Sequence, residues 1–435
     1  MVIEEQKPRR LSPNASNQSK KRCTWFTESR FGLFIHWGIS AIPARGEWVR
    51  GIEKIDDKTY HQYHGEFNPI AYEPKKWAAV AKAAGQKYAV MTAKHHDGYC
   101  LFDSKLTDFK LTNEPGKRDY IREYVDAFRA EGLKIGLYYS LIDWNHPGYP
   151  IDRLHPLREN EIAKQQTRNF DEYLEYFHGQ VMELMKNYGK IDIMWFDFSY
   201  DSMSGEVWKA TELVKAIRSI NPDILIDNRL SSGHEDPFHQ ETGFGDFTSP
   251  EQIIPPDGVT DSKGNPLAWE ACITLNDHWG YVRDDQNYKS AAQAVRMLVE
   301  CVSKGGNLLL NVGPDAKGRI PKESVVRLQQ VGEWMERNSA SIYGCGHAEF
   351  PKPEWGRYTQ RGNFLYAHLF EKPVGAIALL GLGKKIKRAR MLADGSEVDL
   401  QRPWNAGKSE DDVFFNLPGP NLPDPIDTVI ELELL

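Results

Sequence analysis

The chain alternates short apolar runs with longer amphipathic stretches, and this alternation limits its fold more than any other feature. Eight runs have the length and composition of buried strands: residues 31–36, 88–93, 134–139, 191–197, 224–227, a weaker run near 244–247, 271–275 and 308–311. Stretches with apolar residues at three- and four-residue spacing predict helices: residues 75–84, 119–131, 159–188, 206–220, 289–303 and 322–338. Eight strands with helices between most of them favour a parallel (β/α)8-type barrel.

The pattern of apolar residues changes after Gly344. Helical periodicity stops, and short alternating runs at 364–369, 376–380 and 429–434 are separated by Gly, Pro and Asp-Gly. This pattern is typical of a small antiparallel β-sandwich. We therefore expect an α/β protein with a catalytic barrel over residues 25–345, followed by a C-terminal antiparallel β-sandwich over residues 346–435.

Residues 1–21 are polar and charged and lack the apolar core of a signal peptide. They predict a flexible N-terminal arm (residues 1–24) on a cytoplasmic protein. A secreted or periplasmic location is the alternative if a leader was removed.

Composition and charge exclude several classes of function. The net charge is -7 and the basic residues form no stripe, so nucleic acid is not an expected partner. No apolar run approaches the roughly 20 residues that cross a membrane. The five cysteines contain no Cys-x-x-Cys pair, which argues against both a disulfide framework and a cysteine metal site.

Polar groups follow five successive strand runs. His36 ends the first run, His95 and His96 follow the second, Tyr138 lies in the third, Asp197 closes the fourth, and Arg229 follows the fifth. The C-terminal ends of parallel barrel strands meet at one mouth, where barrel enzymes hold their active sites. These groups therefore predict a functional site.

Asp197 fits one of the two carboxyls that a glycoside hydrolase would need. A carboxylate at the end of a buried strand is costly to desolvate unless it has partners or a purpose, and Arg229 nearby would keep it ionised. Glycoside hydrolysis needs a second carboxyl. The irregular stretch after residue 230 offers several, and the pattern leaves the choice open: Asp236, Glu241, Asp246, Glu251 and Glu270.

The histidines allow a second reading, a metal-dependent barrel hydrolase. His36, His95, His96 and Asp97 are all residue types that bind zinc. Adjacent residues of a strand point to opposite faces, however, unless the strand breaks at that point. Neutral imidazoles bind sugar hydroxyls equally well, since they both donate and accept hydrogen bonds.

Together, six motifs resemble the α-L-fucosidases of glycoside hydrolase family 29, and the resemblance runs from Trp25 to Tyr343. The motifs are Arg30-Phe-Gly-Leu-Phe-Ile-His-Trp-Gly38, Gly46-Glu-Trp48, Ala93-Lys-His-His-Asp-Gly98, Tyr138-Tyr-Ser140, Met194-Trp-Phe-Asp197 and Lys304-Gly-Gly-Asn-Leu-Leu-Leu-Asn-Val-Gly-Pro314. The resemblance implies a barrel, a C-terminal sandwich, a retaining exo-acting α-L-fucosidase and no metal or organic cofactor.

The resemblance also implies residue roles. Asp197 is the expected nucleophile. Glu251, within Asp246-Phe-Thr-Ser-Pro-Glu251, is the expected acid/base, with Glu270 as the alternative. The remaining expected substrate-binding residues are His36, Glu47, Trp48, His95, His96, Tyr138, Trp195 and Arg229.

The expected partner is a fucosylated oligosaccharide or glycoconjugate, and self-association into a homo-oligomer fits a barrel with an appended sandwich. Two other functions stay open at this stage. One is a catalytically inactive fucose-binding protein on the same scaffold, and the other is the metal-dependent hydrolase.

Overall fold

The computed structural model describes residues 13–111, 118–231, 242–402 and 411–435. Seven parallel strands form one sheet in the order β5-β4-β3-β2-β1-β7-β6. They are β1 (Phe31–Ile35), β2 (Tyr88–Lys94), β3 (Lys134–Ser140), β4 (Ile193–Asp197), β5 (Leu225–Ile226), β6 (Glu270–Thr274) and β7 (Asn307–Val312). Because β7 pairs with β1, the sheet curls toward closure.

The segment 247–251 takes the eighth place, between β5 and β6. It makes isolated parallel bridges to Asp227 on one side and to Trp269 and Cys272 on the other. The weak strand expected near 244–247 thus lies slightly later in the chain and is irregular. The predicted (β/α)8-type barrel is confirmed, with this segment completing the ring.

Six helices surround the barrel strands or follow the last of them: α5 (Pro74–Ala83), α6 (Tyr120–Ala130), α8 (Phe170–Asn187), α9 (Ala210–Ile220), α10 (Ala291–Ser303) and α11 (Lys322–Asn338). The helix expected over 159–188 is divided into α7 (Glu161–Lys164) and α8. The Asn169 side chain caps α8 by accepting a hydrogen bond from the backbone N–H of Glu172, which starts a new helix there.

Shorter helices lie in the loops. The α-helical turns are α2 (Val49–Ile52), α3 (Asp57–Tyr60) and α4 (Gln62–Glu66). The 3-10 turns are η1 (Ile39–Ala41), η3 (Gly205–Trp208), η4 (Asn228–Leu230) and η5 (Ser339–Ser341). Across the described part of the chain, no helix has both the length and the apolar character needed to cross a membrane.

Helix α1 (Pro13–Ser29) packs against the barrel interior. Its Cys23 and Phe26 are buried in the same apolar cluster as inward-facing side chains of the strands, and the Phe26 ring lies 4.7 Å from that of Phe247. This corrects the prediction of a flexible arm over 1–24, since residues 13–24 are helical. Residues 1–12 lie outside the described part.

The C-terminal region is antiparallel, as predicted. One sheet has the order β11-β13-β9-β8 and the other pairs β10 with β12. The strands are β8 (Gly356–Arg361), β9 (Phe364–Leu369), β10 (Ile377–Leu379), β11 (Ile386–Met391), β12 (Val413–Phe415) and β13 (Thr428–Leu434). Both sheets contribute to one apolar core, which contains Leu365, Ile377, Phe415 and Ile430.

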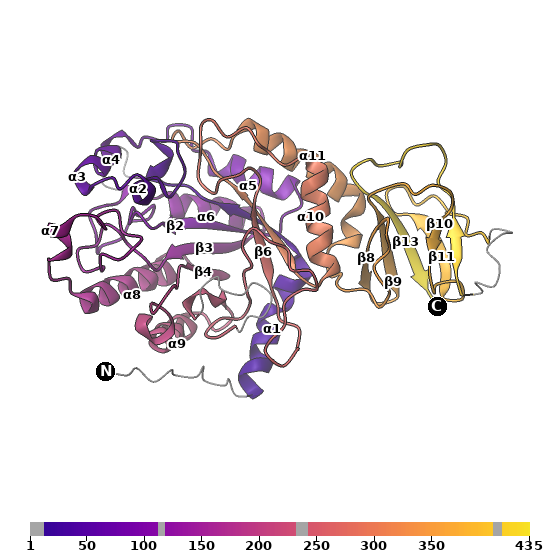
Figure 1. The fold of residues 1–435 in the computed structure, drawn as a ribbon, viewed down its shortest axis with the longest axis horizontal. Helices are drawn as coiled ribbons and strands as arrows, with labels where there is room; N and C mark the ends of the chain where they lie inside the picture. Colours follow the sequence, from indigo (N-terminus) through magenta and orange to yellow (C-terminus); the bar gives the residue numbers. More distant parts are fainter. Residues whose placement is uncertain (1–12, 112–117, 232–241, 403–410) are drawn as a thin grey trace.

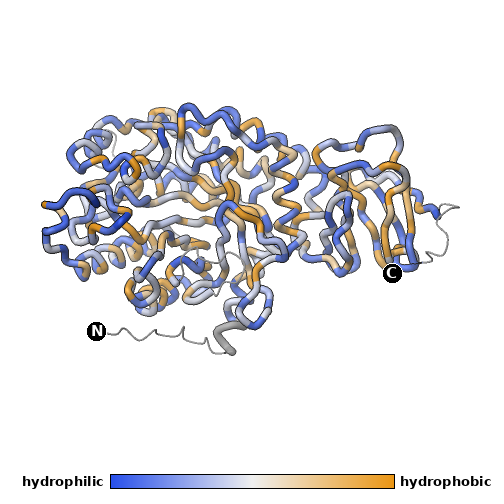
Figure 2. Tube along the Cα trace, in the orientation of Figure 1, coloured by the Kyte–Doolittle hydropathy of each residue, from blue (hydrophilic) through white to orange (hydrophobic). Residues whose placement is uncertain are grey.

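Helices α10 and α11 lie between the barrel sheet and this sandwich (Figure 1). The apolar residues concentrate along the barrel strands and between the two C-terminal sheets, whereas the outer loops are mostly hydrophilic (Figure 2). The barrel therefore offers a rigid, buried frame for side chains at the ends of its strands.

Candidate active site

A cavity of about 340 Å³ opens where the barrel strands end. The side chains that line it are Phe34, His36, Glu47, Trp48, His95, His96, Tyr138, Trp195, Asp197, Phe198, Arg229, Glu251, Cys272 and Trp279. Every residue predicted for the site lies here except the alternative acid/base, Glu270. The convergence of parallel strand ends at one mouth explains why His36, Tyr138 and Asp197 meet, whereas Glu47 and Trp48 come from the loop before α2.

Asp197 is held from two sides at the end of β4. The Arg229 Nη1 atom donates to its Oδ1 at 2.7 Å, and the Tyr138 hydroxyl donates to its Oδ2 at 2.6 Å. Burial raises the pKa of Tyr138 well above its ordinary value, so this phenol is a neutral donor. The carboxylate is thus fixed in orientation at the wall of the cavity.

Arg229 also contacts Glu251, through the same nitrogen. Its Nη1 lies 2.9 Å from Glu251 Oε2 and 2.7 Å from Asp197 Oδ1, so the sum, 5.6 Å, is an upper limit on the separation of these two oxygens. Retaining glycosidases place their carboxyls about 5–5.5 Å apart, and inverting ones about 6.5–9.5 Å. The geometry matches the retaining class.

Ser249 and Trp195 keep Arg229 in place. The Ser249 hydroxyl accepts from Arg229 Nε at 2.9 Å, and the Ser249 carbonyl accepts from Nη2 at 3.0 Å. The guanidinium lies over the Trp195 ring, 4.4 Å from its centre. The segment 247–251 therefore supplies both Glu251 and the anchor of the arginine that orients the two acids.

Glu270 lies deeper in the barrel, at the first residue of β6. It is fully buried, and its two oxygens accept from the Tyr88 hydroxyl at 2.6 Å and from Trp195 Nε1 at 3.1 Å. Burial raises its pKa to about 7. Glu270 thus supports the Trp195 ring from below the cavity.

The other acids considered from the sequence lie elsewhere. Asp246 is buried between Arg22 and Arg218, with ion-pair distances of 2.6 Å and 2.8 Å. Asp236 and Glu241 lie outside the described residues. Of the five candidate second carboxyls, Glu251 lines the cavity, and neither Asp246 nor Glu270 does.

His36 and His96 are neutral at ordinary pH. Burial lowers the pKa of His36 to about 4 and that of His96 to about 3. The Nδ1 atom of His36 lies 2.7 Å from Asn311 Oδ1, and that of His96 lies 2.6 Å from Ser140 Oγ. Each ring therefore has one nitrogen fixed by the protein.

His95 and His96 both line the cavity although they are adjacent. Strand β2 ends at Lys94, and its pairing with β3 is irregular between Thr92 and Lys94. The alternation of a strand no longer applies beyond that point, which is the exception the sequence argument allowed. The His95 ring stacks on Tyr138, with 7° between the ring planes.

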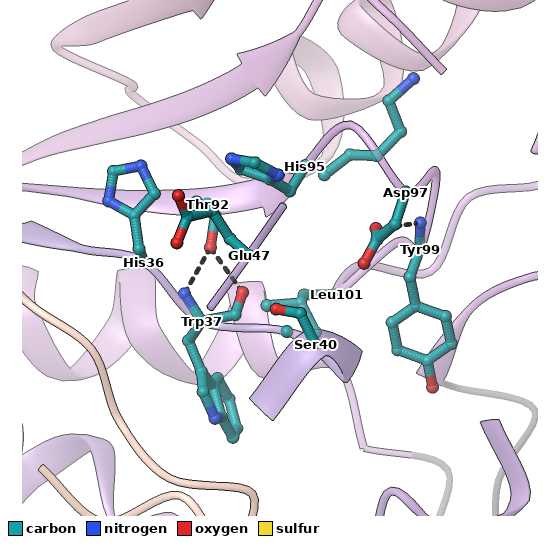
Figure 3. A pocket seen from close by; sticks show the side chains of 11 residues that line it. His36, Trp37, Ser40, Glu47, Thr92, His95, Asp97, Tyr99 and Leu101 are labelled. Carbon is teal, nitrogen blue, oxygen red and sulfur yellow. Dashed lines mark hydrogen bonds between the residues drawn. The ribbon is translucent and has the colours of Figure 1, made fainter. Parts of the chain in front are cut away.

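Figure 3 shows the lining of a second cavity, of about 300 Å³. His36, Glu47 and His95 line both cavities. Figure 3 shows the Thr92 hydroxyl bonded to the backbone of Trp37. This hydroxyl accepts from the Trp37 N–H at 3.0 Å and donates to the Trp37 carbonyl at 2.6 Å. Glu47 is buried, its pKa is raised by burial, and its Oε2 accepts from the backbone N–H of Gly280 at 2.7 Å.

Asp97 faces this second cavity and not the first. Its carboxylate accepts from the Tyr60 hydroxyl at 2.7 Å and from the Tyr99 backbone N–H at 3.0 Å. Among the described residues, no group of three or more His, Cys, Asp or Glu side chains is arranged to hold a metal ion.

Four lining residues were not expected from the sequence: Phe34, Phe198, Cys272 and Trp279. Phe34 and Cys272 point inward from strands, and Phe198 directly follows Asp197. Strand alternation could have predicted Phe34 and Cys272, and the position next to Asp197 could have predicted Phe198. Trp279 comes from the loop after β6 and carries no signal of its own.

Comparison with known proteins agrees with this geometry. The family model described as Alpha-L-fucosidase matches residues 2–340. The solved structure of α-L-fucosidase isoenzyme 1 from Paenibacillus thiaminolyticus is 59% identical, with a TM-score of 0.93 over 96% of this chain and 100% of that chain. A family 29 α-L-fucosidase from Bacteroides thetaiotaomicron is 29% identical, with a TM-score of 0.81 over 99% and 96% of the two chains.

The tissue α-L-fucosidase of Homo sapiens is 27% identical, and the similarity covers 96% of this chain and 90% of the human protein. The family match spans most of the chain, and the neighbouring structures share both the barrel and the sandwich. The chain belongs to the α-L-fucosidases of glycoside hydrolase family 29.

Proposed function

We propose that this protein hydrolyses terminal α-L-fucosyl residues from oligosaccharides or glycoconjugates, by a retaining double displacement. One observation carries the proposal: Asp197 and Glu251 contact the same nitrogen of Arg229, which keeps the separation of the two contacting oxygens below the range of inverting enzymes. Membership of the α-L-fucosidase family identifies fucose as the sugar. Beside the two acids, the cavity is lined by histidines that can bind sugar hydroxyl groups.

The first step forms a covalent glycosyl ester. A carboxylate oxygen of Asp197 bonds to C1 of the fucosyl ring while the bond from C1 to the leaving oxygen breaks. Protonated Glu251 gives its proton to that leaving oxygen, which departs as an alcohol. The Tyr138 hydroxyl and Arg229 hold the Asp197 carboxylate by hydrogen bonds. These donors are already in place, so they need no rearrangement as the carboxylate loses its negative charge on forming the ester.

The second step releases the sugar. Glu251, now a carboxylate, takes a proton from water as the water oxygen bonds to C1, and the Asp197 carboxylate leaves. Two inversions at C1 restore the original configuration. Fucose leaves, and Asp197 and Glu251 regain their starting protonation states.

The walls of the cavity match a deoxysugar. His36, Glu47, His95 and His96 present polar atoms for hydroxyl groups, and the contacts they make are positioning, which contributes to the rate by fixing the reacting geometry. The Trp195 and Trp48 rings add apolar surface for the C–H face and for the methyl group at C5.

The role of Asp197 is tested with Asp197→Ala on an aryl α-L-fucoside. We expect a loss of kcat of about 10⁴-fold or more with the fold intact, because the variant cannot form the ester. Near-full activity in a folded variant would show that Asp197 is not the nucleophile. Release of fucose by the wild type also separates the hydrolase from a non-catalytic fucose-binding protein.

The acid/base is tested by azide rescue of Glu251→Ala and Glu270→Ala on an activated substrate. With Glu251 absent, azide should attack the fucosyl ester without base assistance and restore turnover, giving a fucosyl azide of retained configuration. Rescue confined to the Glu270→Ala variant would assign the role to Glu270 instead.

A further inference from the structure

We propose that Asn311 and the peptide group joining Trp279 to Gly280 are positioning elements for sugar binding, since together they fix His36 with an unprotonated Nε2 and hold Glu47 against the cavity. The inference deepens the proposed function and rests on it for the identity of the ligand. It concerns the Asn311 side chain and a backbone peptide group, which act on the sugar through His36 and Glu47.

The hydrogen-bond pattern fixes the proton on His36. The backbone oxygen of Trp279 lies 2.8 Å from Asn311 Nδ2, and a carbonyl oxygen can only accept, so the amide nitrogen must face it. The amide oxygen of Asn311 then faces His36 Nδ1 at 2.7 Å. That oxygen also can only accept, so Nδ1 carries the ring proton.

A neutral imidazole has one proton, so Nε2 of His36 has a free lone pair. The ring lines the cavity, and its other nitrogen is already engaged by Asn311. His36 therefore accepts a hydrogen bond from a ligand and donates none.

The same peptide group orients Glu47. The N–H of Gly280 belongs to the peptide unit whose oxygen anchors Asn311, and it donates to Glu47 Oε2 at 2.7 Å. A Cβ on Gly280 would lie 3.0 Å from the Glu47 nitrogen and 3.2 Å from Oε2. One rigid peptide unit thus sets the direction of two side chains that line the sugar cavity.

Gly313 makes room for this arrangement. A Cβ at Gly313 would lie 2.7 Å from the Trp279 oxygen and 2.8 Å from the Gly280 main chain. The Asn311-Val-Gly313 part of the β7 motif therefore has a physical meaning: the asparagine anchors the peptide group, and the glycine lets it approach.

His96 shows the same device on the other side of the cavity. The Ser140 hydroxyl donates its only proton to the Ile142 carbonyl at 2.6 Å, so Nδ1 of His96, at 2.6 Å from Ser140 Oγ, must be the donor of that contact. Both rings are thereby fixed as acceptors toward the ligand. His95 differs, since its Nδ1 is buried without a hydrogen-bond partner among the described residues.

The arrangement has a consequence for ligand choice. The sugar hydroxyls that contact His36 and His96 must donate a hydrogen bond. Replacing one of these hydroxyls by fluorine or a methoxy group therefore removes the hydrogen bond as fully as removing the hydroxyl. The charged and titratable groups around His36 are Asp197, Glu251, Arg229, His95, His96, Tyr138 and Glu47.

The first test is the pH profile of kcat/KM for Asn311→Asp with an aryl α-L-fucoside. A carboxylate beside Nδ1 stabilises the imidazolium of His36, and the imidazolium has no acceptor for the sugar. The acid limb should therefore move to higher pH by about 1–3 units. Asn307→Asp is the matched control, because it places the same charge at the other end of β7, beside Arg30.

Coincident acid limbs for Asn311→Asp, the control and the wild type would overturn the proposal. Nitrogen NMR of the wild type with labelled histidine gives a second measurement that needs no folded Asp variant. The His36 signals, assigned by their loss in His36→Gln, should show a protonated Nδ1 and a bare Nε2. A protonated Nε2 would equally overturn the proposal, whatever the enzyme hydrolyses.

Discussion

Phe198 has a backbone conformation that costs free energy. Its φ is 84°, in the left-handed region, and its ring packs against Trp48, His96 and Tyr200 with centroid distances of 5.3, 5.0 and 5.3 Å. Bulky residues occupy this region only where the surroundings enforce it. The strain lies beside Asp197, in the turn that leaves β4 at the cavity.

We predict that Phe198→Gly is more stable than Phe198→Ala by about 1 kcal/mol. Both variants lose the ring, but only glycine adopts a positive φ without strain. Urea unfolding of the pair measures the difference. The control is Lys215, exposed in the middle of α9, where alanine should be the more stable replacement by a similar amount. Equal stability of the two Phe198 variants would contradict the assignment of strain.

Glu270 should make the stability of the protein depend on pH. Its pKa is about 7 when folded, against about 4.3 for an unfolded glutamate, so the folded state binds more protons between these values. The free energy of unfolding then falls as the pH rises from about 4 to 7, by on the order of 3 kcal/mol for this group.

Glu270→Gln removes that ionisation and keeps a donor or acceptor for Tyr88 and Trp195. We expect its free energy of unfolding to fall less than that of the wild type between pH 5 and pH 8, as measured by urea titration at both values. Parallel pH dependence in the two proteins would show that burial of Glu270 is not the cause.

Much of the site was predictable residue by residue, because a group at the end of a parallel barrel strand has little freedom of placement. His36, Tyr138 and Asp197 follow from that rule alone. Trp279 does not, since its loop is positioned by a contact with Asn311 and Gly313 on another strand. Depth in the barrel, which separates Glu251 at the cavity from Glu270 beneath Trp195, is likewise not visible in the sequence.

Among the elements, α1 and the segment 247–251 were the hardest to predict. Segment 247–251 contains Pro250 and makes only isolated bridges, so it lacks the pattern of a strand. Helix α1 is mostly polar, and over residues 18–29 only Cys23 and Phe26 are buried. Both elements are held by Asp246, which pairs with Arg22 of α1 and with Arg218 of α9. Such contacts between distant segments produce no recognisable pattern in the local sequence.

Helix α1 should contribute to global stability. Phe26 is fully buried, contacts the rings of Tyr88 and Phe247, and its carbonyl accepts from Asn307 Nδ2 at 2.8 Å. We expect Phe26→Ala to lower the free energy of unfolding by about 3–5 kcal/mol. Thr24→Ala, at an exposed position of the same helix, should change it by less than about 0.5 kcal/mol. Chemical denaturation of the two variants makes the comparison, and similar small effects would mean that α1 is not anchored.

At the scale of the whole molecule, the barrel and the sandwich share buried polar contacts. The Trp334 indole of α11 donates to the Asp427 carbonyl at 2.9 Å, and the Asp427 carboxylate lies 2.6 Å from His368 Nδ1 on β9. Arg296 of α10 donates to the carbonyls of Ile426 and Phe370. The change of sequence texture after Gly344 predicted two regions, but these long-range contacts were not predictable from either region alone.

We therefore predict that barrel and sandwich unfold in one cooperative transition, because separating them would expose the fully buried Trp334 ring and break the hydrogen bonds that Trp334 and Arg296 make across the interface. The loss of fucosidase activity and the loss of β-sheet signal on heating should coincide.

Trp334→Ala should lower the free energy of unfolding of barrel and sandwich together by about 3–5 kcal/mol, since it removes a fully buried ring and leaves the Asp427 carbonyl unpaired. Arg337→Ala is the matched control: it breaks the ion pair between the half-exposed Arg337 side chain and Asp424 in the same interface, and it should cost less than about 1 kcal/mol. Two separate transitions in the wild type, with the sandwich melting first while activity persists, would show that the joint between the regions does not couple their unfolding.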